Sequence, residues 1–241
     1  MLLVIALAAS AGIGSIRDAP GADPALDQER VAARVDRPQT PPTRPSRKPN
    51  SPEHKPRERR GATGPTGHLR VVPGRSPRPA GKEIVRFVVE VEGGLPPAAA
   101  DFAEIVTRVL NSRRGWGGGE IGFRRVGRPP ARFRVALTSP ATTDRLCAPL
   151  DTRGIYSCHQ DGRAILNYFR WRGGAKSYRG ELGRYRIYLV NHEVGHSLGH
   201  SAHRACPAAG TRAPVMMQQT MGVAPCVANP WPTADERDFV F

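Results

Sequence analysis

Two histidines and a glutamate near residue 192 have the types and the spacing of a metal site. On a helix, His192 and His196 project from the same face one turn apart, and each can give one ring nitrogen to a zinc ion. Glu193 lies about 100° around the helix from His192, where its carboxylate can take a proton from water on the metal. This pattern, H-E-x-x-H, predicts a zinc hydrolase, most simply a peptidase.

The third ligand of such a site is ambiguous in the sequence. A catalytic zinc ion takes three protein ligands and leaves one position open. Gly199 follows the last expected residue of the helix, where a left-handed cap turns the chain back towards the metal. His200 and His203 both follow this turn, and Cys206 is a further alternative.

The stretch resembles the metzincin zinc peptidases, whose pattern is H-E-x-x-H-x-x-G-x-x-H. The third histidine of that pattern would fall at position 202, but Ala202 stands there. The chain is also similar, over most of residues 83–241, to an actinobacterial family of unknown function, numbered 3152 and described as metallopeptidase-like. The segments that carry this similarity are Leu146–Leu150, Asn191–His196, Cys206–Pro207, Ala213–Thr220 and Asn229–Pro232.

The resemblance gives a way to choose the third ligand. Members of the family keep two residues between their third histidine and a following Cys-Pro, and His203 has this spacing to Cys206. The resemblance therefore implies a one-residue insertion after Gly199 and favours His203 over His200. It also implies a zincin-like fold with a methionine turn beneath the metal, for which Met216 is the better match.

The function implied is hydrolysis of peptide bonds in a peptide or protein substrate, with Zn²⁺ held by three histidines (His192, His196 and His203). Glu193 is then the general base that activates water. No tyrosine directly follows Met217, and Gln218 stands there instead, so no residue is assigned to stabilise the oxyanion. Because the third histidine is displaced, the alternative is a non-catalytic zinc-containing binding protein of the cell envelope.

All four cysteines lie in the C-terminal half of the chain, and their even number is typical of two disulfides formed in an oxidising compartment. Three pairings are possible, and locality favours Cys147–Cys158 and Cys206–Cys226. The absence of a C-x-x-C pair argues against a structural zinc site. We therefore expect a secreted or membrane-anchored monomer.

The N-terminal third predicts no globular fold. Residues 1–15 are apolar and resemble a signal peptide or a truncated membrane anchor. Residues 16–82 are rich in proline and arginine and predict a disordered linker. The net charge of +15 fits anionic cell-envelope polymers or a lipid surface as partners of this basic tail, and it equally fits a solvated surface. Its arginine clusters lack interleaved aromatic residues, so specific binding of nucleic acid is not expected.

Residues 83–241 have the pattern of a folded domain, which the resemblance implies is zincin-like. Their order of strand, helix, several strands and a long helix predicts an α+β fold with one twisted mixed sheet backed by helices. The long helix, expected over 181–198, is apolar on two sides, which predicts that it is buried between layers. The strand expected over 164–169 precedes it and is predicted to be the edge that pairs with an extended substrate. The other elements expected are strands at 84–91, 121–126, 131–138 and 155–158, and a helix at 102–110.

Overall fold

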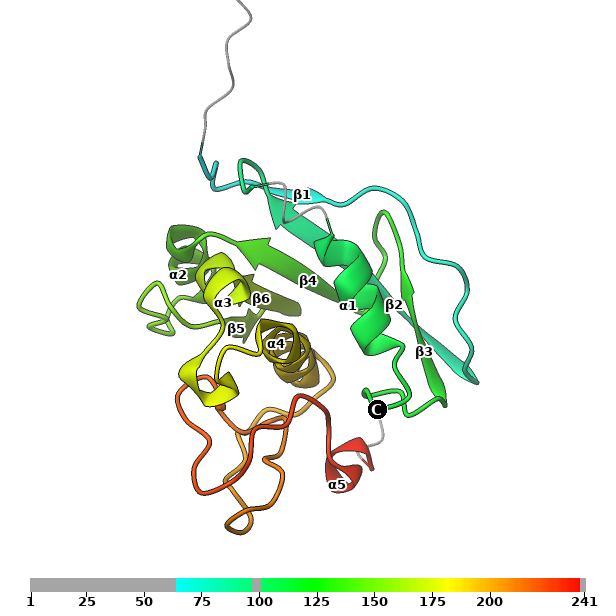
Figure 1. Cartoon of the computed structure of the whole chain (residues 1–241). Coiled ribbons are helices and arrows are strands. Elements are labelled where there is room, and N and C mark those ends of the chain that lie inside the picture. Colours follow the sequence, from blue (N-terminus) through cyan, green and yellow to red (C-terminus); the bar gives the residue numbers. More distant parts are fainter. Residues whose placement is uncertain (1–63, 97–100, 239–241) are drawn as a thin grey trace, which may run out of the picture. The chain divides into compact units, whose positions relative to one another are not determined.

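The structure, a computed structural model, describes residues 64–96 and 101–238. These residues form an α+β arrangement of one open mixed sheet and several helices (Figure 1), as the element order predicts. The strands are β1 (Leu69–Val71), β2 (Glu83–Glu92), β3 (Ile121–Arg125), β4 (Phe133–Thr138), β5 (Cys158–Gln160) and β6 (Arg163–Asn167). The helices are α1 (Phe102–Leu110), α2 (Pro140–Cys147), α3 (Tyr168–Gly173), the 3₁₀ helix η2 (Lys176–Tyr178), α4 (Leu182–Ser197) and α5 (Ala234–Arg237).

The sheet has the order β1-β2-β4-β6-β5, and β3 also pairs with β2. The inner strands are parallel, as in the pairs β2–β4 and β4–β6, while β1 and β5 run antiparallel to their neighbours. Since β3 pairs with the first half of β2 and β1 with its last residues, these two short strands share one side of β2. The sheet is therefore mixed, with parallel strands at its centre.

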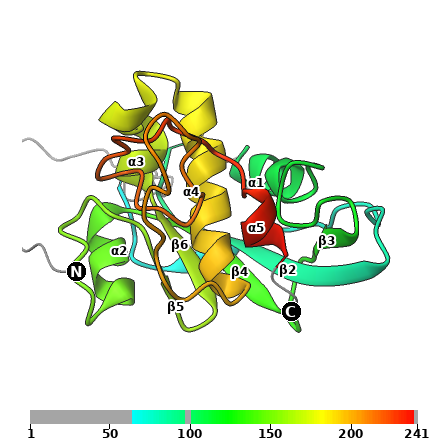
Figure 2. The same cartoon turned by 90° about the horizontal axis from the view of Figure 1, so that it is seen from below.

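One face of the sheet is covered by α1 and α4 (Figures 1 and 2). Successive residues of a strand point to opposite faces, and the large apolar side chains gather on this one. Phe87 stacks on Phe133 with ring centroids 5.7 Å apart, and Phe123 packs edge-on against Phe133 at 6.3 Å. From α1, Phe102 meets Trp171 of α3 at 4.9 Å. The main hydrophobic core lies between this face and the helices.

The opposite face is covered only in part. Helix α2, which the sequence analysis did not predict, packs on it beside β5 and β6. The disulfide between Cys147 and Cys158 joins the end of this helix to β5, with Ile165 of β6 packed against both. The hydroxyl groups of Thr138 and Thr143 hydrogen-bond at 2.7 Å beneath the same helix. Towards β2 and β3, the residues of this face include several arginines.

Helix α4 is buried on more than one side, as its two apolar stripes predict. Its residues from Tyr188 to Gly195 are all buried, and they lie between the sheet and the C-terminal segment. The helix ends in a Schellman arrangement: the N–H of Gly199 donates to His196 O, and that of His200 donates to Gly195 O, both at 3.1 Å. Gly199 has φ +112°, which a residue with a side chain rarely adopts.

Three sequence-based expectations need correction. The predicted linker over residues 16–82 extends too far, because strand β1 lies within that range and pairs with β2. The prediction that the strand at 164–169 is a free edge is wrong. This strand is β6, which lies between β4 and β5, and the antiparallel β5 is the edge. The short strand expected over 155–158 lies further along the chain, because β5 spans Cys158–Gln160. The signal-like segment and the rest of the linker, residues 1–63, lie outside the described residues.

Both disulfides of the structure, Cys147–Cys158 and Cys206–Cys226, have the predicted pairing. Disulfides of this kind are typical of proteins in an oxidising environment outside the cytoplasm. In the described ranges, every helix is too short or too polar to cross a membrane.

Candidate metal centre

His192 and His196 lie one turn apart on α4, and carbonyl groups hold both rings by the same atom. His192 Nδ1 is 2.8 Å from Val215 O, and His196 Nδ1 is 2.6 Å from His200 O. A carbonyl oxygen only accepts hydrogen bonds, so each Nδ1 carries the proton and each Nε2 keeps a free lone pair. Both rings are therefore fixed in the tautomer that a metal needs.

His203 completes the group after the turn at Gly199. The N–H of Ser201 donates to Gly199 O at 2.9 Å, so the chain reverses at once. The N–H of Arg204 donates to Met216 O at 3.1 Å and fixes the segment that carries His203. His203 Nε2 then lies 3.3 Å from His196 Nε2. The turn thus takes up the extra residue and still returns a histidine to the helix.

The three imidazole rings lie at the corners of a nearly equilateral triangle. Their centroids are 5.1 Å (His192–His196), 5.3 Å (His192–His203) and 5.0 Å (His196–His203) apart. Three imidazoles bound to one tetrahedral metal at about 2.0–2.1 Å have ring centres roughly 5 Å apart. One ligand atom of each histidine lies within 4.8 Å of the others, so the group could hold a metal ion.

His200 does not join this group. Its ring packs on Trp116 with centroids 4.7 Å apart, and only its backbone carbonyl serves the site, by accepting from His196. Of the two histidines that the sequence left open, the structure brings His203 and not His200 to the pair on α4. Cys206, the other alternative, is bonded to Cys226 and has no free thiol.

Burial keeps the three imidazoles neutral. It lowers the pKa of His192 to about 3 and that of His196 to about 4, and it also lowers the pKa of His203. A proton on a ring nitrogen would block metal binding there. At neutral pH the group therefore presents three unprotonated donors of the type that zinc prefers.

Glu193 lies beside the histidines and is almost fully buried, with 4% of its surface exposed. Burial without a compensating positive charge raises the pKa of its carboxyl to about 8. Its side chain forms no hydrogen bond or ion pair with another described residue, yet it borders the cavity in front of the histidines. It is therefore a carboxyl group that can hold or release a proton near neutral pH.

Met216 packs beneath the metal group, the name used below for His192, His196 and His203. The resemblance to metzincins places the methionine turn at this position. The Met216 side chain is fully buried under α4 at Gly195, directly before His196. A Cβ atom at Gly195 would overlap both Met216 Sδ and the ring of Trp116. Since Trp116 Nε1 also donates to Asn191 O at 2.9 Å, this contact sets how closely the helix lies on the turn.

Glu236 of α5 holds the turn in place, and the sequence analysis did not identify it. Its carboxylate accepts from the N–H groups of Val215 and Met216 at 2.9 and 2.8 Å. It also accepts from the N–H and the hydroxyl group of Thr233, both at 2.8 Å, so all of its partners lie within the protein. Because Val215 O orients the ring of His192, Glu236 acts on the metal group through this turn. The capping box T-x-x-E at 233–236 is the sequence signal that marks it.

The two glutamines after the turn have different surroundings. Gln219 is fully buried, and its side chain joins Tyr178, Pro214 and Asn229 at 2.8–3.0 Å. Gln218 lines the cavity instead, with its amide nitrogen 3.0 Å from His203 Nε2. A hydrogen-bond donor thus stands at the open side of the metal group.

The cavity in front of the histidines has a volume of about 710 Å³. Its lining includes residues of the loop at 150–157 and of the edge strand β5, together with Gln218 and Met221. His159 of β5 faces into this space with its ring 6.3 Å from that of His196, and its buried Nε2 has no hydrogen-bond partner among the described residues. In the sequence, the position of this histidine directly after the disulfide cysteine Cys158 is the signal that could have identified it. The group is therefore open to a ligand on the side of the sheet edge.

The donor set suits zinc or a similar divalent metal. Three neutral imidazoles in a facial arrangement, with an open side and carbonyl groups behind two of them, match the protein part of a catalytic zinc site. Harder cations such as Mg²⁺ prefer oxygen ligands, and the group offers only nitrogen. The residues therefore fit a zinc ion.

Comparison with known protein families identifies a match to this chain. The model of the family described as Protein of unknown function (DUF3152) matches residues 59–233. No curated protein is similar enough to match the chain. The matched range contains the three histidines, Glu193, Met216 and both disulfides.

Proposed function

We propose that this chain, which belongs to the DUF3152 family, is a zinc-dependent peptidase of the metzincin type. One observation carries the proposal: three neutral imidazoles converge at the open side of a cavity in which a buried carboxyl group stands beside them. A site with a purely structural metal is normally closed by four protein ligands. Here the described residues supply three.

The proposed roles follow from the geometry. His192, His196 and His203 would hold Zn²⁺, which when bound lowers the pKa of water to about 7 and polarises a carbonyl group. Glu193 takes the proton from the attacking water and passes it to the leaving amine. Its buried position suits this role, because a carboxyl group with a raised pKa can both accept and release a proton near neutral pH.

Gln218 and the edge strand complete the proposed site. The amide of Gln218, 3.0 Å from His203 Nε2, would turn from that ring to donate a hydrogen bond to the substrate oxygen on which negative charge develops. Among the described residues, strand β5 pairs only with β6, so its other edge can accept an extended substrate as an added strand. Met216 and the turn beneath α4 position the ligands, and the resemblance to metzincins rests on this arrangement together with the H-E-x-x-H helix.

A Glu193→Gln substitution tests the proposal. The amide keeps the size of the side chain but cannot accept a proton, so hydrolysis of a peptide library by the zinc-loaded chain should fall by about 10²–10⁴-fold. Zinc content, measured by mass spectrometry of the metal, should remain one ion per chain. The matched control is Glu104→Gln on the exposed side of α1, which should cleave at the rate of the unmodified chain.

Cleavage at an unchanged rate by the Glu193→Gln chain would contradict the proposed base. A second candidate function, independent of that result, is a zinc-containing binding protein of the cell envelope without turnover. The hydrogen bond between Gln218 and His203 favours it, because a ligand that is already engaged binds a metal less readily. Stoichiometric zinc with no cleavage of any peptide would support this second function.

The partners follow from the proposed activity. The proposed substrate is a peptide or protein, and the proposed location is outside the cytoplasm, as a secreted or membrane-anchored protein, which the two disulfides support. The basic N-terminal segment would contact anionic polymers or lipids of the cell envelope.

A further inference from the structure

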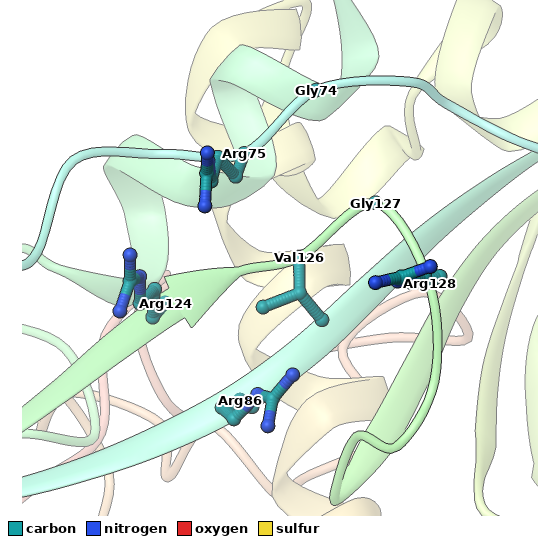
Figure 3. Close-up of a pocket in the computed structure, with 7 residues that line it drawn as sticks. All are labelled: Gly74, Arg75, Arg86, Arg124, Val126, Gly127 and Arg128. Atoms are coloured by element: carbon teal, nitrogen blue, oxygen red, sulfur yellow. The ribbon is translucent and has the colours of Figure 1, made fainter.

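A second cavity lies on the face of the sheet that points away from the metal group. It has a volume of about 610 Å³ and lies over β2 and β3 (Figure 3). Arg86 rises from β2 and Arg124 from β3, while Arg75 and Arg128 come from the loops above the sheet. The three other residues that line the cavity are Gly74, Val126 and Gly127. Its lining therefore holds four positive charges and no acidic group.

These arginines have no counter-charge among the residues that the structure describes. None of the ion pairs or side-chain hydrogen bonds among the described residues involves Arg75, Arg86, Arg124 or Arg128. The Nε atom of Arg124 is buried and has no hydrogen-bond partner in the same part of the chain. A buried donor without a partner costs free energy, so the fold alone does not account for this side chain.

The register of the sheet places two of the charges side by side. Arg86 and Arg124 are directly paired residues of the parallel strands β2 and β3. Neighbouring strands lie about 4.8 Å apart, and like charges directly opposite each other are destabilising. By contrast, Arg163 on the same face is paired with Glu90 at 2.7 Å. An acidic partner is therefore available to one arginine of this face and is missing where the arginines cluster.

The walls of the cavity are held in place. Loop 72–76 is fixed to β3, because Arg125 N donates to Ser76 Oγ at 3.0 Å and Ser76 N donates to Arg125 O at 3.1 Å. The guanidinium group of Arg125 also donates to Pro73 O at 3.0 Å. A Cβ atom on Gly127 would meet Gly74 O at 3.0 Å, so the two loops touch. The arginines therefore border a formed hollow and not a collapsed surface.

We propose that this cavity binds a phosphate group, either free or as the headgroup of a lipid. Guanidinium groups donate paired hydrogen bonds to oxyanions. A carboxylate is satisfied by one such fork, whereas a phosphate carries more oxygen atoms and up to two charges and can receive forks from several directions. The volume also leaves room for the molecule that carries the phosphate. The site is separate from the metal group, since residues 86 and 124 alternate with the core residues 87 and 123.

The test compares three forms of the full chain: unmodified, Arg86→Gln/Arg124→Gln, and Arg108→Gln/Arg172→Gln. The third is the matched control, because it removes two exposed arginines from α1 and α3 and leaves the N-terminal segment unchanged. Binding of inorganic phosphate is measured by calorimetry, and binding to phosphatidylcholine vesicles with and without phosphatidylglycerol by co-sedimentation. We expect affinity to fall about tenfold or more in the cavity variant and to change less than about twofold in the control.

Each result decides the proposal. Arginine-dependent binding of inorganic phosphate supports a free phosphate, and arginine-dependent binding of the anionic vesicles alone supports a lipid headgroup. Equal binding by all three forms, or no binding of either probe by the unmodified chain, would overturn the proposal. To separate loss of binding from loss of folding, Arg75→Gln/Arg128→Gln removes two exposed loop side chains and should weaken binding in the same direction. Unchanged binding by this second variant would also count against the site.

Discussion

The two faces of the sheet differ in the charge of the basic side chains that cluster on them. On the helix-covered face, three histidines lie close together, and burial lowers their pKa so that they stay neutral. On the open face, two arginines lie side by side in register, and each carries a guanidinium cation. Charge is therefore absent from the cluster on one face, whereas on the other face it is kept around a hollow.

This difference separates two kinds of ligand. Neutral nitrogen donors, which run from the buried His192 to the exposed His203, are suited to a metal cation, which brings its own charge. Permanent cations around an exposed hollow are suited to an anion. Alternation along one strand is sufficient for both, because Phe87 and Phe123 face the core while their neighbours Arg86 and Arg124 face the hollow.

The largest expected effect is on the helix-covered face, at Glu236. Glu236→Ala leaves the backbone N–H groups of Val215 and Met216 without a partner in a buried place, so we expect the free energy of unfolding to fall by about 3–5 kcal/mol. Zinc affinity should also fall by about 10–100-fold, because the turn orients the ring of His192. Urea unfolding and chelator competition measure the two effects.

The control for this variant is the adjacent Asp235→Ala. Asp235 is exposed and pairs with Arg204, and a surface ion pair contributes less than about 1 kcal/mol. Equal loss of stability in the two variants would mean that the buried carboxylate has no special role in holding the turn.

A smaller effect is expected from the charge of Glu193 in the metal-free chain. Its folded pKa of about 8 exceeds the ordinary value of 4.5, so the unfolded chain loses this proton first, and stability falls as the pH rises from 4.5 to 8. Glu193→Gln removes this loss and should stabilise the metal-free chain by roughly 2–4 kcal/mol at pH 8. At pH 4 the two chains should be equally stable.

Thermal unfolding with a chelator at the two pH values checks this prediction. Arg86→Gln is the comparison from the other face, where removal of one exposed charge should change stability by less than about 0.5 kcal/mol at either pH. A Glu193→Gln chain that is less stable than the unmodified chain at pH 8 would show that the carboxyl group is not buried without a partner.

The sequence was most informative where local spacing carries the geometry. The long helix, its capping glycine and the alternating strands follow from periodicity and turn chemistry, and both disulfides follow from locality. The edge strand was misassigned because strand order depends on which strands cross over, and no local pattern records that. Strand β1 was missed because three residues between prolines and glycines give no periodicity.

The parts of the candidate site that the sequence did not predict come from distant segments. Glu236 acts on the turn from about twenty residues away, and His159 reaches the group from the sheet edge. The arginine hollow arises because β3 pairs with the first half of β2, which brings residues 86 and 124 into register. Such contacts are set by the sheet and its loops, so neighbouring residues in the chain do not indicate them.

Metal analysis of two histidine variants tests the central claim most directly. The full chain, purified with zinc and passed through a weak chelator, should retain one zinc ion, and His200→Ala should retain it as well because that ring packs on Trp116. His203→Ala should lose it, since His203 is the third member of the group. Zinc retained by His203→Ala and lost by His200→Ala would contradict the assignment of the metal centre.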